Sequence, residues 1–246
     1  VGYNALSSNT SADLNVGIGR QALLSNTTGA QNTALGCDTL DSNTTASNNT
    51  AVGYTSLGTN TTGTSLVAIG AYCLDANTTG SGNVGLGGHA LSGNTTGTNN
   101  TALGHTAGYT NTESSYNTFI GNAAGYTASG SGATQLVYIG HNSGHLTTTA
   151  TLNTGVGAQS LYTNTTGSEN TAIGYNALQA NTTGANNVAV GSQALDANTT
   201  AQHNVAMGKG ALTTATTGGF NTAIGGDTLA ANTTAAGNTA VGFAAL

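Results

Sequence analysis

The segment NTAIGYNALQANTTGANNVAVG, residues 170–191, contains one whole repeat unit and the first residues of the next. Each unit places an aliphatic residue before a glycine, here Ile173 before Gly174 and Val190 before Gly191. The pair recurs along the whole chain, at Gly2, Gly19, Gly36, Gly53, Gly70, Gly87, Gly104, Gly121, Gly140, Gly157, Gly174, Gly191, Gly208, Gly225 and Gly242. The spacing is seventeen in thirteen of the fourteen steps and nineteen in the other. Such a fixed period indicates a repeat architecture.

The residues before each glycine alternate in size. With the glycine as position 0, position −1 is aliphatic, −3 is Val or Thr, and −2 is small except at Phe119 and Tyr138. Position +4 is Leu in twelve of fifteen copies. A period of two is typical of a strand, and we predict that the large residues at −3, −1 and +4 form the core. The predicted structural core is Ile18, Leu35, Val52, Ile69, Leu86, Ile173, Val190, Met207, Ile224 and Val241.

A unit this short, with one or two short strands, cannot bury a core alone, so each unit must stack on its neighbours. Repeated Gly, Asn and Thr disfavour a helix. The sequence therefore predicts an all-β fold, a parallel β-solenoid of about 15 turns, each rising about 4.8 Å. Residues 1–246 form a single repeat array, with irregular turns and a two-residue insertion at about 105–152.

Charge is scarce, with two basic and eight acidic residues, and proline is absent. A charge repeated in every turn would face its own copy at about 5 Å, and proline would remove a ladder N–H. So few cations argue against nucleic-acid binding, and no apolar run approaches the length that inserts into a membrane. Cys37 and Cys73 lie two turns apart, about 10 Å along the axis, so we predict no disulfide between them.

Two columns of asparagine run through the repeat, at −4 and +7. They form either amide ladders between turns or corners in which the asparagine backbone is left-handed. The corner role is the simpler interpretation. Ten of the asparagines at +7 open Asn-Thr-Thr or Asn-Thr-Ser triplets, which match the N-glycosylation acceptor pattern. Crowding between adjacent turns would prevent full occupancy. The candidate acceptors are Asn9, Asn26, Asn43, Asn60, Asn77, Asn94, Asn164, Asn181, Asn198 and Asn232.

Turns 7 to 9 depart from the pattern, because Leu at +4 becomes Gly108, Gly125 and Gly144. Aromatic residues gather in the same part of the chain. One interpretation is a sugar-stacking surface, for which the candidate residues are Tyr109, Tyr116, Tyr126, Tyr138 and His141. The other, which we favour, is that aromatics such as Phe119 and Tyr138 refill a core that has lost its leucines.

No catalytic constellation emerges from the remaining residues. The five histidines occupy scattered columns, and none accompanies a carboxylate and a nucleophile in a family-like order. His141 and His145 are four apart, but no helix is expected there to bring them onto one metal ion. We therefore predict no enzyme activity, no cofactor and no metal site.

The segments NTAIG (170–174), NVAVG (187–191) and NTAVG (238–242) resemble the head repeats of trimeric autotransporter adhesins. The longer unit at 170–184 is similar to repeats of phage and bacterial tail-fibre domain proteins. The resemblance covers essentially the whole chain. It implies a left-handed parallel β-roll, often trimeric, in an extracellular attachment fibre.

These observations predict a structural, non-enzymatic segment of an adhesin or of a viral or phage fibre, placed outside a cell, on its surface or on a virion. A thin core favours self-association, as a homotrimer or filament, with the small −2 column against the partner. A host surface glycan or receptor is a further expected partner. The alternatives are an ice-binding solenoid, which needs an uninterrupted Thr face, and a glycosylated surface filament subunit.

Overall fold

The computed structural model of the chain describes residues 1–130 and 132–245, so Ser131 of the predicted insertion lies outside the described residues. The described chain is all β, with no helix, and forms a parallel β-solenoid as predicted. Every strand has three residues and ends at the residue before a repeat glycine, from Gly19 to Gly242. The described residues contain no helix that could span a membrane.

The chain divides into two compact units, and the division falls inside the stretch predicted to be irregular. Unit 1 comprises Val1–Asn122 with Ser129 and Gly130, and unit 2 comprises Ala123–Ala128 with residues 132–245. Unit 1 contains strands β1 (Val16–Ile18), β2 (Thr33–Leu35), β3 (Thr50–Val52), β4 (Val67–Ile69), β5 (Val84–Leu86), β6 (Thr101–Leu103) and β7 (Thr118–Ile120). Unit 2 contains β8 (Val137–Ile139), β9 (Thr154–Val156), β10 (Thr171–Ile173), β11 (Val188–Val190), β12 (Val205–Met207), β13 (Thr222–Ile224) and β14 (Thr239–Val241).

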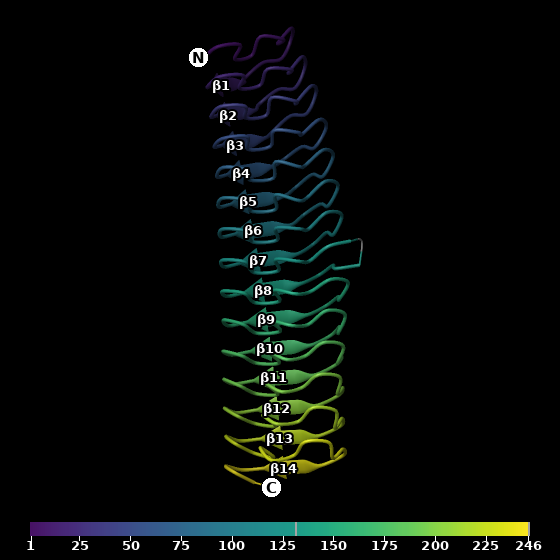
Figure 1. Ribbon diagram of the computed structural model, residues 1–246. Helices are drawn as coiled ribbons and strands as arrows, with labels where there is room; N and C mark the ends of the chain where they lie inside the picture. The colour runs from purple at the N-terminus through teal and green to yellow at the C-terminus, as the bar shows by residue number, and fades with distance from the viewer. Residues whose placement is uncertain (131, 246) are drawn as a thin grey trace. The chain divides into compact units, whose positions relative to one another are not determined.

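Within each unit the strands stack in chain order and pair in parallel (Figure 1). The register advances by one repeat at each step, so that Ile173 pairs with Val190 and Val190 pairs with Met207. Equivalent residues of successive turns therefore form columns, as the constant spacing of the repeat predicts.

The predicted sense of the strand alternation is wrong. In β10, Ala172 is fully buried whereas Ile173 is 41% exposed. The −2 column faces inward, and the −3 and −1 columns face outward. Of the predicted core, Val52 and Val190 are half-buried and the others are exposed: Ile18, Leu35, Ile69, Leu86, Ile173, Met207, Ile224 and Val241.

The reason is the narrow interior of each turn, where position −2 lies against the leucine at +4. A Cβ built on Gly17 would lie 3.1 Å from Cγ of Leu6, and one on Gly85 would lie 3.5 Å from Cδ1 of Leu74. Only Ala or Gly fits opposite the leucine unless the leucine is lost. The larger strand residues therefore point out of the turn.

The core consists instead of the +4 leucines, the small +3 and −2 residues, and the two asparagine columns. Leu40 and Leu57 are fully buried although their φ angles are 50° and 53°, in the left-handed region that bulky residues avoid. Burying a leucine side chain stabilises the fold by about 1.5–3 kcal/mol, which offsets that backbone strain.

The repeat glycine is required by both conformation and space. Gly174 has a φ of 138°, and a Cβ there would lie 2.5 Å from the carbonyl oxygen of Gly191 in the next turn. Any side chain at position 0 would therefore collide with backbone, which explains why this glycine marks every turn.

The asparagines form amide ladders rather than corners. Nδ2 of Asn43 donates to Oδ1 of Asn26 at 2.8 Å and to the carbonyl oxygen of Ala46 at 3.0 Å. In the −4 column, the backbone N–H of Asn49 donates to Oδ1 of Asn32 at 3.1 Å. The non-glycine residues with positive φ lie at other positions, mainly +2, +4 and +12, so the interpretation of these two columns as left-handed corners is wrong.

Candidate functional site

The outward strand face is an uncharged surface two side chains wide in each unit. Its −3 positions are Val or Thr and its −1 positions are aliphatic, as in Thr171 and Ile173 of β10. Large hydrophobic side chains on it remain exposed: Val16, Ile18, Leu35, Ile69, Val84, Leu86 and Leu103 in unit 1, and Ile173, Met207, Ile224 and Val241 in unit 2. Contiguous apolar surface of this kind marks an interaction site more often than an isolated exposed side chain does.

The predicted aromatic surface is not a single site. Tyr138 is fully buried in unit 2, where its hydroxyl lies 2.9 Å from Oγ1 of Thr147 and burial raises its pKa to about 12. Tyr138 therefore does not belong to a binding surface. Tyr109 and Tyr116 lie in unit 1, with Tyr116 exposed, whereas Tyr126 and His141 lie in unit 2, with His141 exposed. In the repeat, Tyr109 and Tyr126 share position +5, whereas Tyr116 is at +12 and His141 at +1.

The compensation interpretation of turns 7 to 9 is confirmed. Phe119 and Tyr138 sit at the inward −2 position and are fully buried. A Cβ on Gly108 would lie 2.7 Å from Cδ2 of Phe119, and a Cβ on Gly144 would overlap the ring of Tyr138. In each case the ring occupies space that the missing +4 leucine leaves.

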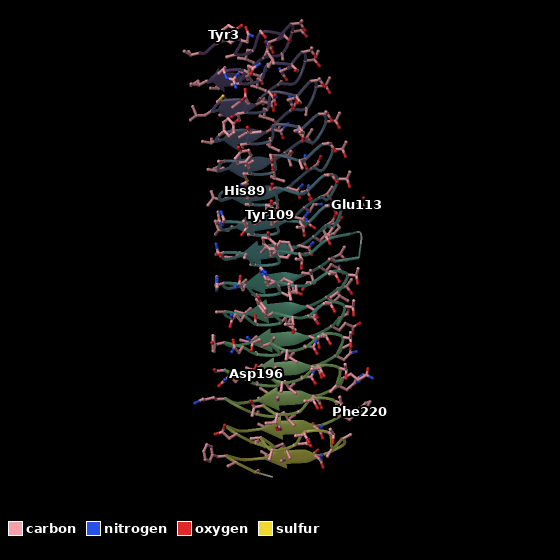
Figure 2. All side chains as sticks on the ribbon, in the orientation of Figure 1. Tyr3, His89, Tyr109, Glu113, Asp196 and Phe220 are labelled. Carbon is pink, nitrogen blue, oxygen red and sulfur yellow. The ribbon has the colours of Figure 1, made fainter. Side chains whose placement is uncertain are left out.

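Aromatic side chains form stacks that the sequence did not reveal. In unit 1, the rings of Tyr72 and His89 are stacked 5.0 Å apart, and His105 and Tyr109 pack edge-on against His89. Figure 2 labels His89 and Tyr109. In unit 2, His145 lies between Tyr126 and Tyr162, at 4.9 and 5.2 Å. Tyr72 and His89 occupy position +2 of consecutive turns, and Tyr126, His145 and Tyr162 occupy position +5. An alignment of the repeats could therefore have predicted both stacks.

A third stack lies at the +12 corner of unit 2. The rings of His203 and Phe220 are 4.8 Å apart and nearly parallel, at 3°. Phe220 is 64% exposed, and Figure 2 labels it at the loop edge of its turn. The next residue in the column is Gly237, where a Cβ would meet nothing within 4 Å.

The structure argues against the glycosylation sites. Asn26, Asn43, Asn60, Asn77, Asn94, Asn164, Asn181 and Asn198 are fully buried. The amide of Asn181 donates to Oδ1 of Asn164 and to the carbonyl oxygen of Gly184, so both of its N–H groups are engaged. A glycan on that nitrogen would break the ladder. Asn232 is half-buried and Asn9 exposed, each in a turn next to the end of the described chain.

Within the part of the chain that the structure describes, the few charged side chains lie apart from one another, except for the pair Arg20 and Asp38 and its neighbour Asp41. Burial raises the pKa of Asp41, with a further contribution from Asp38, and burial raises the pKa of Asp196. Burial also raises the pKa of the Cys73 thiol to about 12, which keeps it protonated and unreactive. Arg20 pairs with Asp38 at 2.6 Å on the surface. Among the described residues, no three His, Cys, Asp or Glu side chains come together as metal ligands would.

No family model matches the chain, and no curated protein or solved structure matches it either. The resemblance to adhesin and tail-fibre repeats therefore stays a prediction.

Proposed function

We propose that the chain is a structural, non-enzymatic segment of an extracellular attachment fibre, belonging to an adhesin or to a viral or phage fibre. Copies associate through the outward strand face, formed by positions −3 and −1. The observation that carries the proposal is this uncharged face of Val, Thr and longer aliphatic side chains, repeated on every described strand.

The geometry of the face supports a partner of the same kind. Seven strands spaced about 4.8 Å apart, each with three residues rising about 3.3 Å, make a footprint of roughly 330 Å² per unit. A standard interface buries about 800 Å² on each partner, so one unit alone falls short of it. A second copy presents the same periodic face, so its aliphatic columns can pack against those of each unit.

The experiment is a measurement of mass in solution, by light scattering, for the natural chain and for two matched lysine variants. Ile173→Lys with Met207→Lys places two charges on the strand face, two turns apart. Thr166→Lys with Thr200→Lys places two charges at the same spacing on the exposed +9 column. We expect a multimer that the first pair dissociates and the second leaves intact. A monomeric natural chain, or equal behaviour of both variants, contradicts the proposal.

A second candidate, an ice-binding surface, is favoured by one observation. The +9 column of unit 2 is an uninterrupted row of exposed threonines: Thr149, Thr166, Thr183, Thr200, Thr217 and Thr234. In unit 1, Glu113 interrupts the equivalent column (Figure 2). A thermal hysteresis assay tests this candidate, and replacing Thr183 and Thr200 with valine or lysine separates a Thr-specific effect from a nonspecific one.

A further inference from the structure

We infer that Phe220 forms a stacking platform for one pyranose ring of a carbohydrate. The inference rests on the proposed attachment role and assigns that role a ligand class and a place. Its basis is an exposed ring that stacks on a neighbouring ring on one side and is open on the other.

The support comes from the stack with His203, which lies 4.8 Å away and within 3° of parallel. Both residues have left-handed φ angles, 60° for His203 and 61° for Phe220, so consecutive turns present the two side chains in the same way. A ring held by its backbone and by a neighbour loses little freedom on binding, which favours affinity.

The open side results from Gly237. In unit 2, Tyr162 is followed at its own column position by Gln179, whereas Phe220 is followed by a glycine without a side chain. A Cβ at Gly237 would meet no atom within 4 Å, so the space above the ring is free. Phe220 thus exposes 64% of its surface in a conformation that is unfavourable for a bulky residue, and it does not contribute to the core.

The chemistry of the opening fits a sugar. Aromatic rings carry negative charge on their faces, and the C–H groups on one side of a pyranose are weakly positive, so the two surfaces stack. Thr234, three residues before Gly237 in the same turn, is exposed and lies outside the −3 and −1 columns, and its hydroxyl can pair with the hydroxyls of a sugar.

Residues found at position +12 in other turns provide conservative substitutions for the test. Asn48, Asn99 and Asn186 occupy the +12 position in other turns, so Phe220→Asn removes the ring and keeps a residue suited to the backbone. Tyr116 occupies the same position with a φ of 62°, so Gly237→Tyr covers the open face without imposing a new conformation. Leu152→Ala changes an exposed, non-aromatic side chain at the same corner and is the control.

The test is saturation-transfer NMR with methyl β-D-galactopyranoside and methyl β-D-glucopyranoside on the natural chain and these three variants. We expect transfer to the C–H groups of one sugar face, with Kd weakened about tenfold in Phe220→Asn and Gly237→Tyr and unchanged in Leu152→Ala. Absence of transfer, or transfer that survives Phe220→Asn, overturns the inference.

The mass of each variant separates this inference from the proposed function. Phe220→Asn should keep the mass of the natural chain, because Phe220 lies outside the −3 and −1 columns. A lower mass in that variant would show that the ring contacts another copy, which also overturns the sugar platform. Failure of sugar binding with an intact multimer refutes the platform and leaves the fibre proposal standing.

Discussion

Tyr138 occupies the space that a leucine side chain fills in regular turns, because its ring lies where a Cβ on Gly144 would be. The two residues sit on opposite sides of one turn of unit 2, at the inward −2 and +4 positions. The absence of leucine at position 144 and the presence of an aromatic ring at position 138 are therefore structurally coupled.

This coupling predicts a non-additive pair of substitutions. Gly144→Leu alone overfills the core and should lower the free energy of unfolding by about 3 kcal/mol. Tyr138→Ala alone opens a cavity and should lower it by about 4 kcal/mol. The double variant restores the regular leucine and alanine, so its loss should be smaller than either. Urea denaturation measures all three, and additive losses would refute the coupling.

The repeat glycine and its neighbour form a matched pair for testing the backbone argument. Gly87 has a φ of 135°, and a Cβ there would lie 2.6 Å from the carbonyl oxygen of Gly104. Gly87→Ala should therefore cost more than about 3 kcal/mol of unfolding free energy. Gly88→Ala places its Cβ 3.5 Å from Cδ2 of His105, an ordinary contact, and should change stability by less than about 0.5 kcal/mol. Similar thermal shifts in the two variants would contradict this account.

The amide ladder has a gap that can be filled. Oδ1 of Asn198 is buried without a hydrogen-bond partner, because the next residue in its column is Ala215. Ala215→Asn would supply the missing donor and should raise the free energy of unfolding by about 1 kcal/mol. Asn181→Ala interrupts an intact part of the same ladder and should lower it by about 2 kcal/mol. Denaturation midpoints that move the other way would refute the ladder as a source of stability.

The half-buried carboxyl groups predict a pH dependence of stability. The pKa of Asp196 is raised by burial in the folded chain, so the folded state holds its proton more tightly than the unfolded state. Its contribution is complete below the unfolded pKa near 3.8 and is lost as the pH rises through the folded pKa. Asp196→Asn should therefore be more stable than the natural chain at neutral pH, with the advantage vanishing in acid. Glu169→Gln, at an exposed corner, is the control.

The sequence predicts the architecture, because thirteen equal spacings between glycines require a stacked turn. It does not predict which strand face points inward, since Thr171-Ala172-Ile173 is compatible with either sense of alternation. In the structure Ala172 points inward, because the leucine at +4 and two asparagines already fill the narrow turn and leave room only for a small side chain. The prediction that the larger strand side chains are buried assumed a wider core than a turn of seventeen residues can enclose.

The candidate site was predictable only in part. Recruitment of Phe119 and Tyr138 into the core follows from the missing leucines, which are visible in the sequence. The Phe220 platform depends on a single neighbour, Gly237, whose lack of a side chain matters only once the two are known to share a column. Comparing each aromatic residue with its equivalent in the next repeat would have identified it.

The central claim is that copies of the chain meet through the outward strand face, and the labelling rate of a cysteine on that face tests it most directly. In a Cys37→Ser background, Ile173→Cys places a thiol at an exposed position of the strand face and Thr183→Cys places one on the exposed +9 column. The account predicts that a maleimide reacts slowly with Ile173→Cys and rapidly with Thr183→Cys in the assembled protein, and that the difference disappears on dissociation. Rapid labelling of Ile173→Cys in the assembled protein would contradict the claim.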